Sequence, residues 1–255
     1  MSKLPKEHQF TDLSDYGRPV AKFIANSLKN TSFTPIHVTI AFIISGLMAI
    51  YCIIMGYYWL AAFFLIFKSI LDAADGELAR VKQKPSYTGR YLDSVADIIL
   101  NALFLSAIWY ITNISIWICF LAFFGLQLQG TLYNYYYVIL RNRFDGDTTS
   151  RVFEDKTPEA LAGEKQQHVN ILFGLYKLLY GVFDKVIYTL DSNADKGSIL
   201  PNWLMTGVST FGLGFQLLII AILLVLGLKA IILPFFLLYT LMIFVFVGIR
   251  KFFYK

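Results

Sequence analysis

The chain has 255 residues, of which 57% are hydrophobic and only 15% are charged. Soluble domains carry about 25% charged residues, so this composition excludes an ordinary soluble protein and favours one embedded in a membrane. The net charge of +5 comes from basic residues spread over many segments, so no nucleic-acid partner is expected.

Residues 1–33 are mostly polar and form the expected cytoplasmic N-terminal segment. From Arg18 to Lys29 the sequence is amphipathic, and Pro19 suits the first turn of a helix. One helical face carries Val20, Phe23, Ile24 and Leu28. We therefore expect an interfacial helix in the lipid headgroup layer, with an ordinary soluble cap as the alternative.

Apolar stretches then recur along the chain and are interpreted as membrane-spanning helices. They lie near residues 36–56, 58–71, 98–111, 114–126, 203–228 and 230–249. Several reach the roughly 20 residues that a span needs only when their polar ends are included. Thr112 and Asn113 alone mark the turn between the third and the fourth. The expected fold is an all-α integral membrane protein with six transmembrane helices, four in residues 34–140 and two in residues 201–255.

Residues 141–200 are the one sizeable polar insertion, and residues 141–147 have the composition of a loop. Further on, apolar residues recur at helical spacing, at Leu172, Tyr176, Leu179, Phe183, Ile187 and Leu190. Charged residues, Lys177, Asp184 and Lys185, interrupt this pattern. It therefore predicts a second interfacial amphipathic helix rather than a seventh span.

Lys and Arg gather before the first span, between the second and third, in the insertion and at the C-terminus, whereas the other links carry almost none. Because basic residues are enriched on the cytoplasmic side of membrane proteins, both termini are expected to be cytoplasmic. The link between the second and third spans is then cytoplasmic as well.

That link is flanked by a motif with one fixed spacing, D-x2-D-G-x2-A-R-x8-G-x3-D-x3-D, formed by Asp72, Asp75, Gly76, Ala79, Arg80, Gly89, Asp93 and Asp97. On helices, the residues of each half share one face. A turn within residues 81–88 would bring the four carboxylates to one pocket. Ionised carboxylates are costly in a low-dielectric setting unless they are compensated, so the cluster predicts a bound cation.

The donor set of this cluster contains only oxygen and no histidine, which favours Mg²⁺, Mn²⁺ or Ca²⁺ over zinc. Four carboxylates carry more charge than one divalent ion needs. Two divalent cations with an anionic ligand are therefore expected, an arrangement suited to displacement at phosphorus. Arg80 is expected to pair with an aspartate or with Glu77, and Lys68 could reach either the cluster or the membrane surface.

All eight motif positions match the signature of the CDP-alcohol phosphatidyltransferases, and the chain resembles this family over residues 18–140 and 200–250. The resemblance implies two divalent cations, Mg²⁺ or Mn²⁺, held by the four aspartates, with Asp97 as general base. It also implies that the nucleotide lies against Gly76, Ala79 and Gly89. Thr39 is a further candidate nucleotide contact, although Ile36 stands where similar proteins often have Asn.

The resemblance implies an enzyme of phospholipid synthesis that transfers a phosphatidyl group from CDP-diacylglycerol to a small polar alcohol and releases CMP. Two alternatives stay open: a CDP-choline or CDP-ethanolamine donor acting on diacylglycerol, and a divalent-cation transporter with an acidic selectivity site. Similar proteins are commonly homodimers, so a second copy is an expected partner beside the bilayer.

The acceptor alcohol is not specified by the sequence: glycerol phosphate, inositol phosphate, inositol and serine all fit. A phosphorylated acceptor would need basic residues near the metals, for which the candidates are Arg141, Arg143, Arg151 and Arg250. The alternative interpretation of these arginines is ordinary cytoplasmic loop charge.

Overall fold

The computed structural model describes residues 4–144 and 156–254, and every regular element in these residues is a helix. Two short 3-10 turns, η1 (Lys6–His8) and η2 (Leu13–Asp15), precede ten α-helices in these ranges. The helices are α1 (Arg18–Leu28), α2 (Pro35–Ile54), α3 (Tyr58–Val81), α4 (Tyr87–Thr112), α5 (Ile116–Arg143), α6 (Gln166–Leu190), α7 (Asn202–Ser209), α8 (Leu213–Val225), α9 (Lys229–Tyr239) and α10 (Met242–Phe253).

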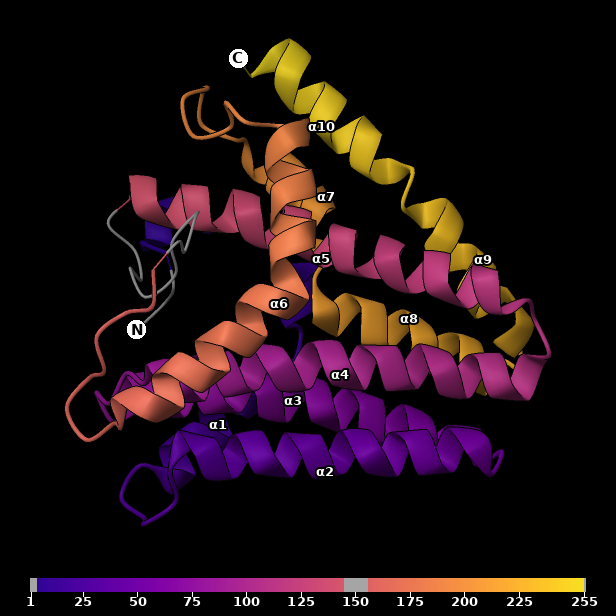
Figure 1. Ribbon diagram of the computed structural model, residues 1–255, viewed down its shortest axis with the longest axis horizontal. Helices are drawn as coiled ribbons and strands as arrows, with labels where there is room; N and C mark the ends of the chain where they lie inside the picture. Colours follow the sequence, from indigo (N-terminus) through magenta and orange to yellow (C-terminus); the bar gives the residue numbers. More distant parts are fainter. Residues whose placement is uncertain (1–3, 145–155, 255) are drawn as a thin grey trace.

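Figure 1 shows α2, α3, α4 and α8 running in nearly one direction, with α5 inclined above them. One apolar core joins α1 to α4, the first half of α5, α8 and α9. A second core joins the other half of α5 to α7, α10 and the N-terminal segment. The two motif-bearing helices, α3 and α4, belong to the first core.

Local sequence signals set the ends of the motif-bearing helices and of their neighbour α2. Thr34 caps α2 by accepting a hydrogen bond from the backbone N–H of His37, and Pro35 occupies the first turn. Ser86 caps α4 by accepting from the N–H of Gly89 at 2.8 Å. Asn113, in the left-handed conformation, ends α4 where the sequence predicted a turn.

Within residues 4–144 and 156–254, four helical stretches are long and apolar enough to cross a membrane: α2, α4, α5, and α9 with α10 taken together. The bent pair of α7 and α8 would make a fifth. Helix α3 does not qualify among the described helices, because Lys68, Asp72 and Asp75 fall within its apolar part. The part of the chain that the structure describes therefore has four to five candidate spans, and the sixth expected span stays a prediction.

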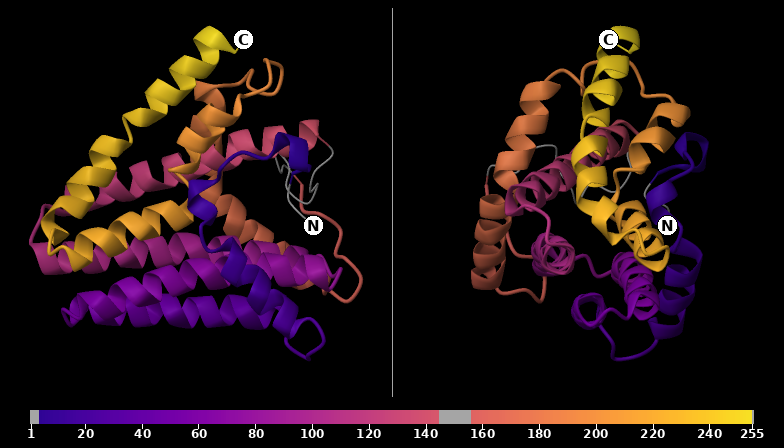
Figure 2. Two further views of the ribbon diagram at one scale, coloured as in Figure 1. Left: turned by 180° about the vertical axis from the view of Figure 1, so that it is seen from behind. Right: turned by 90° about the vertical axis from the view of Figure 1, so that its right-hand side faces the viewer.

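The stretch expected as one span over 203–228 is not one straight helix. Helices α7 and α8 meet at a bend of 49°. The N-terminal segment packs at this break, where Leu13 donates its N–H to the Ser209 side chain at 2.9 Å. In addition, a Cβ on Gly214 would lie only 2.0 Å from the carbonyl oxygen of Ser14. Figure 2 shows this segment crossing from α5 over α8 to α1.

Both expected amphipathic helices form. Helix α1 buries Ala21 and Ala25 and leaves Val20 and Phe23 exposed. Helix α6 is longer than the predicted pattern and packs against α4 and α5. Exposed apolar side chains on α1 fit the headgroup layer, but the interfacial position of both helices stays a prediction.

Candidate metal and nucleotide site

The two halves of the motif face each other from α3 and α4. Carboxylate oxygens of Asp72, Asp75 and Asp93 all lie within 4.8 Å of one another. The turn that joins the helices, residues 82–86, includes Gln83 with a positive φ of 51°. The arrangement thus brings the carboxylates of three of the four aspartates close together, as their helical spacing predicted.

Thr39 of α2 contacts this cluster directly. Its hydroxyl donates to a carboxylate oxygen of Asp75 at 2.8 Å, and both residues are buried. Because α2 packs against both α3 and α4, it holds the Asp75 side chain from outside the motif. The contact of Thr39 with a nucleotide, expected from the sequence, stays a prediction.

Asp97 is not part of this group of three, and Lys68 links it to Asp72. The Lys68 ammonium donates to Asp97 and lies 3.5 Å from a carboxylate oxygen of Asp72. Lys68 is fully buried, with its ammonium 4.6 Å from the centre of the Phe42 ring. The sequence left open whether Lys68 reaches the acidic cluster or the membrane surface, and the structure shows it at the cluster. The spacing of four residues between Lys68 and Asp72 was the only sequence signal for it.

The small motif residues make close contacts with their own neighbours. A Cβ on Gly76 would lie 3.6 Å from an Nη atom of Arg80, and one on Gly89 would lie 3.2 Å from the Ser86 hydroxyl. Arg80 pairs with Glu77 at 3.0 Å, one of the partners expected from the sequence. Ala79 lies one residue before Arg80 and is partly buried.

The first turn of α4 is held by a residue that sequence reasoning missed. One oxygen of Glu164 accepts hydrogen bonds from the Ser86 hydroxyl and the Thr88 N–H, each at 2.7 Å. The other oxygen accepts from the N–H groups of Tyr87 and Leu161. Partial burial of the Glu164 carboxylate opposes ionisation, but these hydrogen bonds outweigh it and lower its pKa.

Helix α6 also braces the motif half on α4. The Tyr180 hydroxyl donates to the backbone carbonyl of Ser94 at 2.9 Å, directly after Asp93. Tyr91 packs against Phe173 and Tyr176 of the same helix. No local pattern in the sequence pointed to these contacts, which join the insertion to the helix that carries two of the aspartates.

The candidate acceptor arginines have other partners or fall outside the described residues. Arg141 is buried, with its guanidinium 5.1 Å from the Tyr137 ring centre. Arg143 donates to the backbone carbonyls of Asp195 and Gly197, and Arg250 pairs with Asp191 at 2.8 Å. Arg151 lies outside the described residues.

The three converging carboxylates fit a hard divalent cation. They offer only oxygen, the donor type that Mg²⁺ and Mn²⁺ prefer. One oxygen of Asp93 is buried and has no hydrogen-bond partner among the described residues, as expected for an atom that a ligand should satisfy. Lys68 supplies one positive charge to four aspartates, so the cluster keeps an excess of negative charge.

Fold and site together define an all-helical protein, over the described residues, with candidate membrane spans and an acidic cluster that could hold a divalent cation. The family model described as CDP-alcohol phosphatidyltransferase matches residues 33–156. This region contains α2 to α5 and the whole motif, so the chain is similar to this family over just under half of its length. No curated protein matches the chain significantly. The match to the family model supports transferase activity with a CDP-linked donor and an alcohol acceptor, and it is consistent with the use of a divalent metal.

Proposed function

We propose that the protein is a membrane enzyme of phospholipid synthesis that transfers a phosphatidyl group from CDP-diacylglycerol to a small polar alcohol. The observation that carries this proposal is the convergence of Asp72, Asp75 and Asp93 within 4.8 Å, inside the region that the family model matches. In this reaction the acceptor oxygen forms a bond to phosphorus, and the bond from phosphorus to CMP breaks.

The four aspartates would hold two divalent cations, Mg²⁺ or Mn²⁺. Such ions neutralise a pyrophosphate and stabilise the charge on the leaving nucleotide. Asp75 enters this site already oriented by Thr39, and Asp97 is oriented by Lys68. Each carboxylate is thus positioned by a side chain of a neighbouring helix, so ligand binding should need little rearrangement of α2, α3 and α4.

Asp97 would act as the general base. A carboxylate within hydrogen-bond reach of the acceptor hydroxyl can take its proton as the new bond to phosphorus forms. Asp97 suits this role because it is not among the three converging carboxylates, so it would be available to the acceptor in addition to its share in cation binding. The nucleotide would lie near Gly76, Ala79 and Gly89, with Arg80 as a supporting residue.

The donor keeps its acyl chains in the bilayer while its nucleotide enters from the cytoplasm. We place the site at the cytoplasmic face and both termini in the cytoplasm, because basic residues concentrate in those segments. A phosphorylated acceptor would use Arg141, Arg143 or Arg151, and a homodimer is the proposed assembly. The division into segments 1–33, 34–140, 141–200 and 201–255 is part of the same proposal.

A panel assay tests this function. The purified protein in lipid vesicles receives labelled CDP-diacylglycerol, Mn²⁺ or Mg²⁺, and each candidate alcohol separately, and CMP and the lipid product are measured. Parallel samples contain CDP-choline or CDP-ethanolamine with diacylglycerol, and a third set measures metal flux.

We expect CMP release from CDP-diacylglycerol with one acceptor, lost in Asp93→Asn and kept in Asp195→Asn, an exposed aspartate outside the cluster. CMP release only from the amino-alcohol donors would contradict the proposed donor. Metal flux without any CMP release would contradict the enzyme itself.

A further inference from the structure

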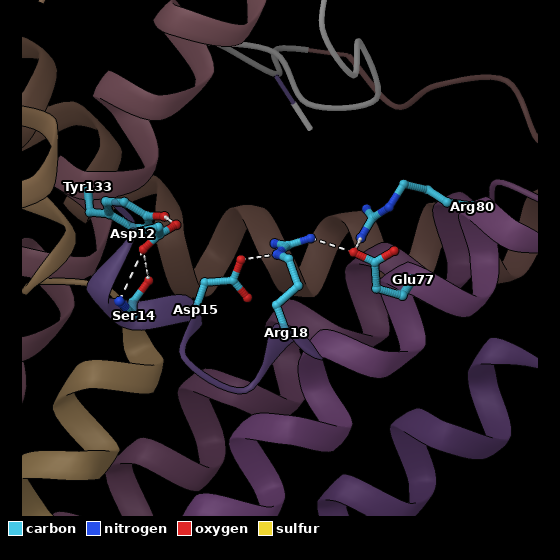
Figure 3. Close-up of polar contacts among 7 residues, drawn as sticks. All are labelled: Asp12, Ser14, Asp15, Arg18, Glu77, Arg80 and Tyr133. Atoms are coloured by element: carbon cyan, nitrogen blue, oxygen red, sulfur yellow. Dashed lines mark hydrogen bonds and ion pairs between the residues drawn. The ribbon is translucent and has the colours of Figure 1, made fainter. Parts of the chain in front are cut away.

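Four side chains of alternating charge connect the N-terminal segment to the motif arginine (Figure 3). Arg18 pairs with Asp15 and, through Nη1, with Oε1 of Glu77. Arg80 binds the same Oε1 from the other side, with its Nη2 at 3.0 Å. Glu77 is 2% exposed, so its carboxylate depends on these two guanidinium groups for compensation.

Arg80 is left with unused hydrogen-bonding capacity. Its Nε is buried and has no partner among the residues that the structure describes. Its guanidinium lies over Gly76, because a Cβ there would be 3.6 and 3.7 Å from its two Nη atoms. Gly76 directly follows Asp75, so the group lies next to the helical turn that carries the carboxylate cluster. Arginine is well suited to phosphate at such a place.

The segment that carries Arg18 is itself anchored. Asp12 accepts hydrogen bonds from the Tyr133 hydroxyl of α5 and from the N–H of Ser14 (Figure 3). Leu13 donates its N–H to Ser209 at the end of α7. Arg18 therefore approaches Glu77 from a backbone that is fixed against two other helices.

We propose that Arg18, which lies outside the region that the family model matches, is a positioning residue of the donor site. Through Glu77 it fixes the guanidinium of Arg80 beside Gly76, where Arg80 binds a phosphate of the CDP-linked donor. This inference rests on the proposed function. Without Arg18, the Glu77 carboxylate keeps a single guanidinium partner and draws Arg80 into a different position.

The first test compares Arg18→Ala with Lys22→Ala in the full-length protein in vesicles, using CDP-diacylglycerol and the acceptor found in the panel assay. Lys22 is an exposed cation on the same helix, so its variant controls for the loss of charge. We expect Arg18→Ala to raise the KM for the donor about tenfold with little change in kcat, which matches the loss of a charged hydrogen bond. Lys22→Ala should change neither value, and Arg18→Lys should recover part of the loss.

The decisive comparison repeats Arg18→Ala in a protein that already carries Arg80→Ala. If Arg18 acts through Arg80, the second substitution should cause no further rise in KM. An equal rise in both backgrounds, or a fall in thermal stability with unchanged KM, would overturn the positioning role. Should Arg18→Ala not fold, Arg18→Gln in the two backgrounds gives the same comparison. Absence of donor turnover in the wild-type protein would refute the proposed function instead.

Discussion

Replacing Lys68 with methionine tests the electrostatics of the cluster. Methionine is close to lysine in length, so Lys68→Met removes the charge and creates little cavity. Lys68 is fully buried and contacts Asp97 and Asp72, so both carboxylates lose their compensating cation. Breaking a buried ion pair from one side costs about 3–5 kcal/mol. At roughly 2–4 °C per kcal/mol for a chain of this size, the apparent Tm should fall by about 6–20 °C in chelator.

Divalent cations should reverse much of this loss. A ligand that binds only the folded state stabilises it, and a cluster without the lysine has more negative charge to offer a cation. The assay is thermal unfolding in detergent micelles, with chelator and with Mg²⁺ or Mn²⁺. Lys229→Met is the matched control, since the Lys229 ammonium contacts the Tyr58 side chain and belongs to no ion pair among the described residues, and the Tm of this variant should change little.

The double variant Lys68→Met with Asp97→Asn provides the second arm. Because both partners of the pair are then neutral, its Tm in chelator should lie above that of Lys68→Met alone. A Lys68→Met protein as stable as wild type in chelator, with the same gain from Mg²⁺, would refute the reasoning that Lys68 compensates the aspartates.

Three further predictions follow from named contacts. Asp97→Asn should lower kcat for CMP release by about 10²–10⁴; undiminished turnover would contradict its role as base. Because its folded-state pKa is lowered, Glu164 contributes stability that is complete above its ordinary pKa of 4.5 and is lost as the pH falls through the lower folded value. Wild type should thus lose its Tm advantage over Glu164→Gln on acidification below about pH 4.5. A Tm difference that does not change with pH would argue against stabilisation of α4 by the ionised Glu164 carboxylate. Gly214→Ala should displace the N-terminal segment, since the new Cβ would meet the Ser14 carbonyl at 2.0 Å. Limited proteolysis before Arg18 should then be faster, and an unchanged digestion rate would show that the contact is relaxed elsewhere.

Local periodicity predicted the convergence of Asp72, Asp75 and Asp93, because residues three or four apart share a helical face and a short turn joins the two helices. The turn at Asn113 was predicted for a similar local reason, since a polar pair interrupted an apolar run. Such features depend only on nearby residues and so can be inferred from one sequence.

Contacts between distant segments were not predicted. Glu164 lies within the insertion and caps α4, 76 to 78 residues away along the chain from its partners, which are the Ser86 hydroxyl and two backbone N–H groups of α4. The bend between α7 and α8 is contacted by the N-terminal segment, which comes from the other end of the chain. The sequence predicted that Arg80 pairs with an aspartate or with Glu77, and the structure shows Glu77. The ion pair between Glu77 and Arg18 could be found only in the tertiary structure.

Direct measurement of Mn²⁺ binding is the sharpest test of the acidic cluster as a cation site for a CDP-linked donor. Electron paramagnetic resonance of the protein in vesicles would follow Mn²⁺ with and without CDP-diacylglycerol. We predict saturable binding that tightens when the donor is added and is lost in Asp93→Asn. Mn²⁺ binding that is equal in Asp93→Asn and wild type, and unchanged by the donor, would contradict the assignment of the acidic cluster as the cation site.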